Sequence, residues 1–421
     1  MQGSVGAVRG RSLPGGTLVV LALLTAVAPF ATDMYLTAFP VMARDLHVPA
    51  SSIQLTLTAF FVGLAVGQLF FGPLSDRYGR RRPLLVGSFV CLGAGVVVAT
   101  APTVPVLVAG RVLQGLGGAA GVVLARAVVA DRAEGAAVAR LFTVMMLIGG
   151  VAPVLAPLAG TAVLAAFGWR GILWVLVGLT ALMFLGALVA VPESLPPERR
   201  AAAGVRTVAR SIRSVLGNRA YVGYGLACAW AFAALFAYIS ASPFVVQNVL
   251  GLSAGQYSVV FGVNAVGLSL GGLVSARLVG RVSERRLLLA GLGVLVSASC
   301  CLLVDVVVLD SPRRPTLVIL FVAVSSLGAV FGNATALAIS QVRDAAGSAS
   351  AFLGASQFAL GALVAPLVGL GGDSAFPMAL TLLVAGVLAA LSAALVASGP
   401  RPAGVRAPVG PAADPVGDLV P

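Results

Sequence analysis

The sequence predicts an all-α membrane protein with twelve transmembrane helices in two pseudo-symmetric six-helix bundles. Of its 421 residues, 59% are hydrophobic and 10% are charged, and the mean hydropathy is +1.04. A water-soluble chain of this length exposes far more charge, so lipid is the expected solvent. Apolar windows follow one another along the chain, and each is long enough to cross about 30 Å of hydrocarbon as a helix. Motifs of the first six windows recur in the second six, which predicts the two bundles.

The apolar windows form two groups on either side of a polar segment. The first group covers residues 17–42, 53–74, 83–101, 105–128, 138–164 and 169–191. The second group covers residues 219–247, 256–279, 285–307, 315–339, 348–372 and 375–397. We therefore expect an N-terminal tail (1–16), a first bundle (17–191), a linker (192–218), a second bundle (219–397) and a disordered C-terminal tail (398–421).

Part of the linker has a helical charge pattern. Residues 206–216 place Arg206, Arg210 and Arg213 on one helical face and mainly apolar residues on the other. This pattern predicts an amphipathic helix on the inner membrane surface. A disordered basic linker is an equally good interpretation.

The arginines predict the orientation of the chain in the membrane. All 27 basic residues are arginine. If the N-terminus lies inside, 22 of them fall in inner segments, Arg111 falls within a span, and four fall in outer segments, namely Arg44, Arg170, Arg313 and Arg314. Positively charged loops stay in the cytoplasm, so both termini are expected to be cytoplasmic.

The two halves of the chain echo one another. Tyr35 and Pro40, near the end of the first window, recur as Tyr238 and Pro243, at an offset of 203 residues. Two further pairs recur in order, at offsets of 200 and 209: Gly72 and Arg77 with Gly272 and Arg277, and Pro157 and Gly160 with Pro366 and Gly369. Such repeats predict two bundles related by an axis along the membrane normal, with a cavity between them near the midplane.

The sequence offers little for enzymatic or metal chemistry. His47 is the single histidine, and the four cysteines lie within apolar windows in no metal-ligand spacing, which argues against a histidine triad, a zinc site and a disulfide framework. The net charge of +13 lies mostly in short gaps between windows, where anionic lipid, not nucleic acid, is the expected partner. No Walker loop is found in the sequence. We expect no enzyme activity, no cofactor and no metal, and an ion gradient as the energy source.

Asp33 is the only carboxylate well within an apolar window, where it lies in the outer half. An ionised carboxylate is unfavourable in hydrocarbon, so Asp33 is the candidate proton carrier. Arg111 lies at a similar depth, and a buried arginine needs an acid or a backbone partner. Two interpretations stay open. Asp33 and Arg111 exchange a salt bridge as the proton binds and leaves, or Arg111 bonds backbone carbonyls while Asp33 caps an outer pocket.

The stretch GPLSDRYGRRRP (72–83) places one acid and four arginines between two apolar windows. Arginines suit the negative C-terminal end of a helix and an anionic leaflet, whereas the acid, Asp76, needs a partner. Arg77, Arg80 and the N-terminus of another helix are the candidates. The stretch resembles the signature loop between helices 2 and 3 of the major facilitator superfamily. The matching residues are Gly72, Asp76, Arg77, Gly79, Arg80 and Arg81.

This resemblance extends over nearly the whole chain and implies the major facilitator fold. It also implies a latch in which Asp76 contacts the start of helix 11, around Ser348, and so closes the cytoplasmic side. Asp131 is placed to join Arg77 in that cluster. The alternative is a basic loop that only sets the topology.

Two further motifs resemble those of the superfamily. The segment from Arg111 to Gly117 (RVLQGLG) is similar to the helix 4 motif. The antiporter motif of helix 5 is resembled by four residues, Gly150, Pro153, Pro157 and Gly160, with Ala156 where a glycine is usual. Ordinary helix packing explains these glycines and prolines equally well.

Residues 32–40 (TDMYLTAFP) are similar to the first helix of drug:proton antiporters of the bicyclomycin/chloramphenicol-resistance (Bcr/CflA) type, with Thr37 at a usual proline position. The second copy of the signature loop has Ala276 in place of the acid, a common change in the superfamily.

The resemblance implies a proton-coupled multidrug efflux antiporter that exports small amphipathic drugs or antibiotics, similar to chloramphenicol or bicyclomycin, by alternating access. Its expected partners are the drug, protons and membrane lipid, and its expected form is a monomer in the cytoplasmic membrane of a bacterium. An apolar, aromatic pocket with a few polar groups suits such a substrate. The candidate pocket residues are Tyr35, Trp230, Phe236, Tyr238, Asn264, Asn333 and Gln357. The alternative is a proton-coupled transporter of a small metabolite on the same fold.

Overall fold

The computed structural model describes residues 15–132, 136–200, 213, 215–309, 311–342, 346–369 and 374–395. Residues 1–14 of the predicted N-terminal tail, the predicted C-terminal tail and most of the predicted amphipathic segment 206–216 lie outside these residues. Within them, nearly all of the chain is helical and no strand is present. The helices of the first half are α1 (Gly15–Leu36), α2 (Phe39–Asp45), α3 (Ala50–Tyr78), α4 (Arg81–Thr100), α5 (Val104–Arg132) and α6 (Ala136–Ala190). Those of the second half are α8 (Arg219–Phe244), α9 (Ala254–Leu278), α10 (Glu284–Val308), α11 (Arg313–Ser340), α12 (Ala346–Gly369) and α13 (Phe376–Leu395).

Eleven of the described helices are long and apolar enough to cross a membrane. One of them, α6, runs for 55 residues and contains two spans, because Gly168 interrupts it with φ 68° and ψ −175°. This φ lies in the left-handed region that glycine adopts at low cost. The break falls between the predicted windows 138–164 and 169–191. The prediction of twelve transmembrane helices is therefore confirmed.

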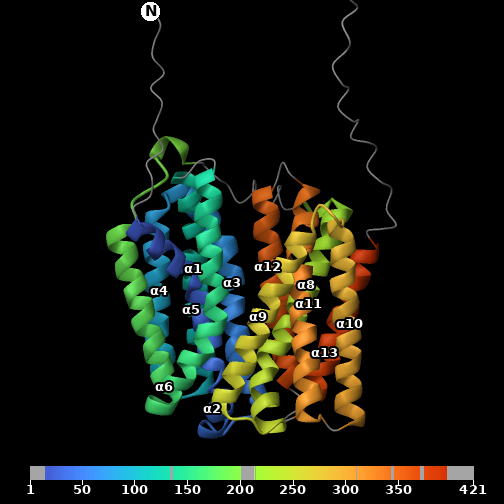
Figure 1. The fold of residues 1–421 in the computed structure, drawn as a ribbon. Helices are drawn as coiled ribbons and strands as arrows, with labels where there is room; N and C mark the ends of the chain where they lie inside the picture. The colour runs from blue at the N-terminus through green and yellow to red at the C-terminus, as the bar shows by residue number, and fades with distance from the viewer. Residues whose placement is uncertain are drawn as a thin grey trace, which may run out of the picture.

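The helices pack as two bundles (Figure 1). In the first half, α3 packs on α5 and α1 on α6, while in the second half α9 and α10 pack on α11 and α8 packs on α12 and α13. Two helix pairs make the main contacts between the bundles, α3 with α12 and α6 with α9, and α8 adds smaller contacts with α2 and α3. Because α3 and α9 are the second span of each half, the two seams are equivalent under the pseudo-symmetry that the sequence repeat predicts.

Glycines allow the paired helices to touch at their backbones. A Cβ added at Gly63 of α3 or at Gly115 of α5 would clash with a backbone carbonyl oxygen of the partner helix. The same holds for Gly271 of α9 and Gly328 of α11, the corresponding pair of the second half. Lipid gives apolar helices little reason to associate, so close backbone contact of this kind supplies much of their attraction.

Side-chain caps begin three helices of the second half. The side chain of Asn218 accepts the backbone N–H of Tyr221 at 3.0 Å at the start of α8. Ser253 and Gln256 form a reciprocal capping box at the start of α9, and Ser283 caps α10. These caps satisfy backbone donors that the helices leave unpaired where they enter the membrane.

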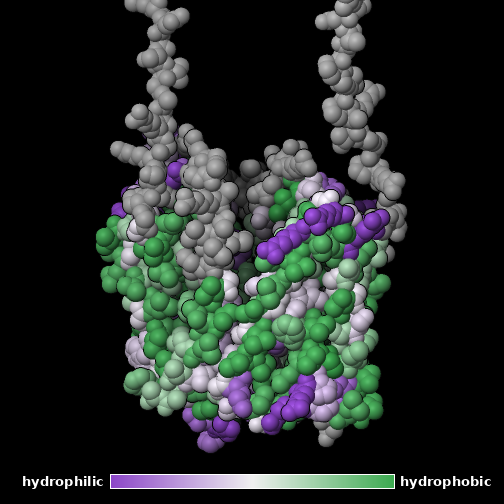
Figure 2. Space-filling model, viewed as in Figure 1, coloured by the Kyte–Doolittle hydropathy of each residue, from purple (hydrophilic) through white to green (hydrophobic). Residues whose placement is uncertain are grey.

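The surface is a hydrophobic belt between two hydrophilic ends (Figure 2). Large apolar side chains are exposed around the belt, such as Phe89, Phe167 and Leu363. One end carries the signature loop, with Arg77, and the loop between α9 and α10. We call this end the arginine-rich face, and the end that carries α2 the opposite face. The belt is the surface expected of a protein that crosses a bilayer several times.

Candidate functional site

Asp33 lies on α1 and is buried, with 6% of its surface exposed. Its carboxylate accepts a hydrogen bond of 2.8 Å from the hydroxyl of the adjacent Thr32. The same hydroxyl also lies 3.0 Å from the carbonyl oxygen of Ala28 and 3.1 Å from that of Pro29. A hydroxyl carries one proton, so Thr32 can donate to only one of these acceptors at a time. Thr32 is therefore able to serve either an ionised or a protonated Asp33.

Asp33 lies near the second bundle. Its carboxylate is within electrostatic range of the hydroxyls of Tyr238 on α8 and Tyr257 on α9. Tyr238 accepts a hydrogen bond of 2.7 Å from the side-chain amide of Asn264, and Tyr257 lies 3.4 Å from the hydroxyl of Ser242. The structure thus brings together Asp33 and two of the predicted pocket residues, Tyr238 and Asn264. Tyr257 was missed, although it is a tyrosine at the edge of an apolar window.

Arg111 is completely buried on α5. It donates to the backbone carbonyl of Ala31 at 2.9 Å and to the side-chain carbonyl of Gln114 at 2.8 Å. Its guanidinium lies 4.1 Å from the ring centre of Tyr35 and 5.1 Å from that of Phe60. In this conformation Arg111 makes no ion pair with Asp33, so the first of the two interpretations is not realised here. The backbone carbonyl of the second interpretation is present, two residues before Asp33.

An aromatic cluster joins the bundles beside this region. Phe236 of α8 packs edge-on against Phe61 of α3, with ring centres 4.3 Å apart. Phe61 also stacks on Phe358 of α12 at 5.5 Å, and Phe232 stacks on Phe236 at 4.9 Å. Of these rings only Phe236 is among the predicted pocket residues. The cluster gives the interface between the bundles an apolar and aromatic character.

The other predicted pocket residues are spread over different parts of the molecule. The hydroxyl of Tyr35 pairs with Thr56 at 2.7 Å inside the first bundle. Asn333 donates to the hydroxyl of Ser275 at 2.7 Å, near the arginine-rich end of α9 and away from Asn264. Gln357 donates to the sulfur of Cys228 at 2.9 Å, and Trp230 is partly buried against the core.

The predicted antiporter motif lies on α6 at the seam with α9. The carbonyl oxygen of Pro157 accepts a hydrogen bond of 2.9 Å from Ser258 of the second bundle. Gly160 packs so closely on α1 that an added Cβ would clash with the carbonyl oxygen of Met34, next to Asp33. An added Cβ at Gly150 would meet nothing within 4 Å. Pro153 lies within the helix, one turn before Pro157.

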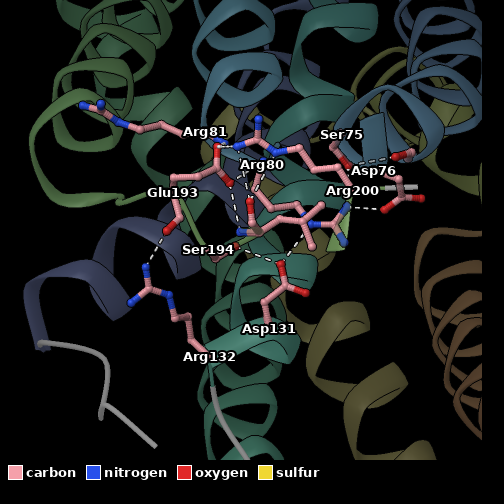
Figure 3. A network of polar contacts seen from close by, with 11 residues as sticks. Ser75, Asp76, Arg80, Arg81, Asp131, Arg132, Glu193, Ser194 and Arg200 are labelled. Carbon is pink, nitrogen blue, oxygen red and sulfur yellow. Dashed lines mark hydrogen bonds and ion pairs between the residues drawn. The ribbon is translucent and has the colours of Figure 1, made fainter. Parts of the chain in front are cut away.

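The signature loop forms a polar cluster centred on Arg80 (Figure 3). Arg80 donates to Asp76 at 2.5 Å, to Asp131 at 3.0 Å and to the hydroxyl of Ser75 at 2.7 Å. Ser194 donates to the same oxygen of Asp131 at 2.9 Å. Burial opposes the charge of Arg80, but the hydrogen bonds and charges of Asp131 and Asp76 outweigh it and raise the pKa of the guanidinium.

Glu193 is a further member of this cluster, which the sequence does not predict. It lies in the segment after α6, and its carboxylate accepts the backbone N–H groups of Arg80 at 2.8 Å and Arg81 at 3.3 Å (Figure 3). It therefore caps the N-terminus of α4 from 113 residues away. Burial alone would raise the pKa of Glu193, but these bonds, a third from Leu195 and the charge of Arg200 hold it below the ordinary 4.5.

The remaining signature residues have separate positions. Asp131 was expected to join Arg77, but it pairs with Arg80, and Arg77 is exposed and lies over the ring of Tyr78. Arg81 donates to the carbonyl of Leu188 at 2.8 Å. Gly79 has φ 87°, and Gly72 has open space beside it.

Asp76 has Arg80 as its partner in this structure, and the side chain of Ser348, the expected contact in the other bundle, lies outside the described residues.

Comparisons with known proteins agree with the geometry. A sequence model described as Major Facilitator Superfamily matches residues 21–366 and 240–416. The transporter YdgK of Bacillus subtilis, named an uncharacterized MFS-type transporter, is 36% identical over 89% of this chain and 93% of its own length. The bicyclomycin resistance protein homolog of Haemophilus influenzae is 30% identical over 87% and 92%. An inward-facing bacterial homolog of the lysosomal transporter Spinster has a TM-score of 0.71 at 17% identity, over 90% of this chain and 95% of that one, which shows a shared fold.

Proposed function

The chain belongs to the major facilitator superfamily of membrane transporters, and from this premise we propose that it is a proton-coupled antiporter that exports small amphipathic drugs or antibiotics. The observation that carries the proposal is the buried carboxylate of Asp33, which lies near Tyr238 and Tyr257 of the second bundle. A relative named for bicyclomycin resistance supports the substrate class. The resemblance of residues 32–40 to drug:proton antiporters points the same way.

The proposed location is the cytoplasmic membrane of a bacterium, with both termini in the cytoplasm and the protein acting as a monomer. The arginine bias supports this orientation, because the arginine-rich face then lies on the cytoplasmic side. In the same orientation α2 and Asp33 lie towards the outside.

Thr32 gives the proposed proton step a structural basis. An ionised Asp33 accepts a hydrogen bond from the Thr32 hydroxyl. A protonated Asp33 can instead donate to that oxygen, while the hydroxyl proton turns to the carbonyl of Ala28 or Pro29. Both protonation states of Asp33 are thus hydrogen-bonded without movement of the helix. The change in the charge of Asp33 alters the electrostatic environment of the tyrosines of the other bundle. The free energy of proton binding is proposed to act there.

Alternating access is proposed to exchange contacts at the two faces. At the opposite face, Phe39 packs on Phe244 with ring centres 6.0 Å apart, and Thr161 lies 2.6 Å from the hydroxyl of Ser258. These contacts join the bundles. At the arginine-rich face, Asp76 is instead held by Arg80 of its own bundle. We propose that Asp76 moves to the start of α12 when that face closes, which is the latch that the signature loop implies.

The drug is proposed to bind between Asp33 and the aromatic cluster. Phe236 and Tyr238 are aromatic side chains buried there in this structure, and Asn264 provides a polar group. Trp230 and Gln357 of the second bundle are further candidates. Tyr35 is proposed to act indirectly, because its ring and hydroxyl are engaged by Arg111 and Thr56.

Flux measurements in proteoliposomes test the proposal. With the wild-type protein, an imposed pH gradient is expected to drive accumulation of a drug identified in a susceptibility panel. Asp33→Asn is expected to abolish this accumulation while drug binding remains. Asp305→Asn is the matched control, because Asp305 is also buried but pairs with Thr316 at 2.6 Å on the α10–α11 hairpin. Proton-driven accumulation by the Asp33→Asn variant, or accumulation of a metabolite and no drug by the wild type, contradicts the proposal.

A further inference from the structure

The loop between α9 and α10 shares one backbone feature with the signature loop, a glycine with positive φ followed by an arginine, but it is longer and lacks the acid at the position of Asp76. Gly280 has φ 94° and, with one residue inserted in the second copy, corresponds to Gly79, which has φ 87°. Arg281 follows it, as Arg80 follows Gly79. Arg80 is neutralised by Asp76 and Asp131, but the position of Asp76 is taken by Ala276 in the second copy.

Four arginines around this loop are left without an acid. They are Arg277, Arg281, Arg285 and Arg286. Within the described part of the chain none of them makes an ion pair, although Glu284 lies among them in sequence. The Nε of Arg285 is buried and lacks a hydrogen-bond partner there. Such a cluster attracts an anion with several acceptor oxygens, since guanidinium groups match phosphate geometry.

An apolar stripe leads from these arginines into the membrane. Exposed apolar side chains follow one another at helical spacing on α9, namely Val259, Val263, Val266 and Leu270. Val274 and Arg277 continue the same face. The first four line a groove of about 380 Å³ between α6, α9 and α11. The lining of the groove is apolar, with Leu158 of α6 and Phe321 of α11 on its sides.

We infer that this surface binds an anionic phospholipid, with its phosphate on the four arginines and an acyl chain along the stripe. The hydrophilic band above a hydrophobic surface is visible on the second bundle (Figure 2). Leu270 lies seven residues from Arg277 on one helix, or about 10 Å at 1.5 Å per residue. A chain that reaches the middle of the bilayer extends roughly 15 Å and so enters the groove. A free phosphate ion would use the arginines but not the stripe.

The site lies on one of the two seams between the bundles. The groove is lined by both α6 and α9, so a bound acyl chain touches both bundles. The four arginines belong to the second bundle alone. The lipid is therefore held by one bundle at its headgroup and contacts the other within the membrane.

Native mass spectrometry of the full-length protein tests this inference. The protein is purified in detergent and incubated with phosphatidylglycerol, phosphatidylethanolamine or glycerol phosphate. The wild type is expected to retain phosphatidylglycerol selectively. The double variants R277A/R281A and R285A/R286A are each expected to weaken this binding, by about fivefold per arginine removed, because a surface arginine contributes about 1 kcal/mol toward anionic lipid.

The matched control is R219A/R314A, which removes two exposed arginines outside the site and the same net charge. It should retain phosphatidylglycerol as the wild type does. Two separate double variants are used so that one still tests the site if the other fails to fold, as judged by size-exclusion chromatography. Equal retention by the wild type and a folded double variant overturns the inference. Equal binding of phosphatidylethanolamine, or displacement of the lipid by glycerol phosphate at a similar concentration, also overturns it.

Discussion

Thr37 and Ser240 occupy equivalent positions in the two halves, 203 residues apart, and each accepts a hydrogen bond from a glutamine of the opposite bundle. The amide of Gln54 donates to the carbonyl of Ser240 at 3.0 Å, and the amide of Gln247 donates to the carbonyl of Thr37 at 3.3 Å. Both bonds lie near the opposite face. The glutamines themselves do not correspond under the repeat, so the two halves reach the same pair of contacts by different side chains.

Removing either glutamine is expected to loosen the opposite face. A hydrogen bond of this kind contributes about 1 kcal/mol, so Gln54→Ala and Gln247→Ala should each raise the open-to-closed ratio at that face about fivefold. Spin labels at positions 44 and 314, in a variant without the four native cysteines, report the distance across the face by double electron–electron resonance. Gln256→Ala is the control, because Gln256 bonds only within the first turn of α9. An unchanged distance distribution in both glutamine variants refutes this role.

Arg111 is expected to be important for stability because its contacts are buried. Arg111 and Arg170 each stack on an aromatic ring at 4.1 Å and donate to a backbone carbonyl, but Arg111 is fully buried and Arg170 is exposed. A lysine cannot reproduce the planar, multiple contacts of a guanidinium. Arg111→Lys should therefore lower the free energy of unfolding by about 2–4 kcal/mol, and Arg170→Lys by less than about 1 kcal/mol. Melting temperatures in detergent measure the difference, and equal losses in the two variants contradict the argument.

Hydropathy and repeats were sufficient to predict the spans and the position of Asp33, because a span of about 20 residues is a local property of the chain. The partners of buried charges were harder to predict. The pairing of Arg111 with Ala31 and of Asp131 with Arg80 depends on the rotation and lateral contacts of the helices. The depth of a residue in the membrane does not determine these. Glu193 gave no signal at all, since it is one of two acids, with Glu198, in a polar segment far along the chain from the loop that it caps.

Gly160 is expected to tolerate no side chain. A Cβ there would collide with the backbone carbonyl oxygen of Met34 on α1. A backbone atom cannot rotate away as a side chain can. Gly160→Ala should separate α1 from α6, destabilise the protein by about 1–3 kcal/mol and impair proton-driven transport. Gly150→Ala is a control within the same motif, because it meets nothing within 4 Å and should stabilise the helix slightly. Equal transport and stability in the two variants would show that the close contact is unimportant.

Glu193 should make stability depend on pH. Its folded-state pKa is lower than the ordinary 4.5, so its contribution is complete above about pH 4.5 and is lost as the pH falls through the folded-state value. The melting temperature of Glu193→Gln should therefore lie below that of the wild type at neutral pH and approach it in acid. The exposed Glu198 of the same segment provides the control, Glu198→Gln, which should track the wild type throughout. A constant difference between wild type and Glu193→Gln across this range contradicts the assignment.

Arg80 and Asp76 should bias the proposed latch in opposite directions. The side chain of Asp76 is 45% exposed, so its ion pair with Arg80 contributes at most about 1 kcal/mol and is readily exchanged. The side chain of Arg80 is 12% exposed, and its ion pair with Asp131 remains when Asp76 moves away. Arg80→Ala should free Asp76 and favour closure of the arginine-rich face, whereas Asp76→Asn should disfavour it.

Spin labels at positions 82 and 219, which are exposed on that face in the two bundles, measure its closure in the same cysteine-free background. Arg80→Ala is expected to increase the short-distance population by up to about fivefold, and Asp76→Asn to reduce it. Arg77→Ala serves as the control, because Arg77 makes no ion pair within the described part of the chain. If Arg80→Ala and Asp76→Asn shift the population in the same direction, Arg80 does not compete for Asp76, and the loop acts through its basic charge alone.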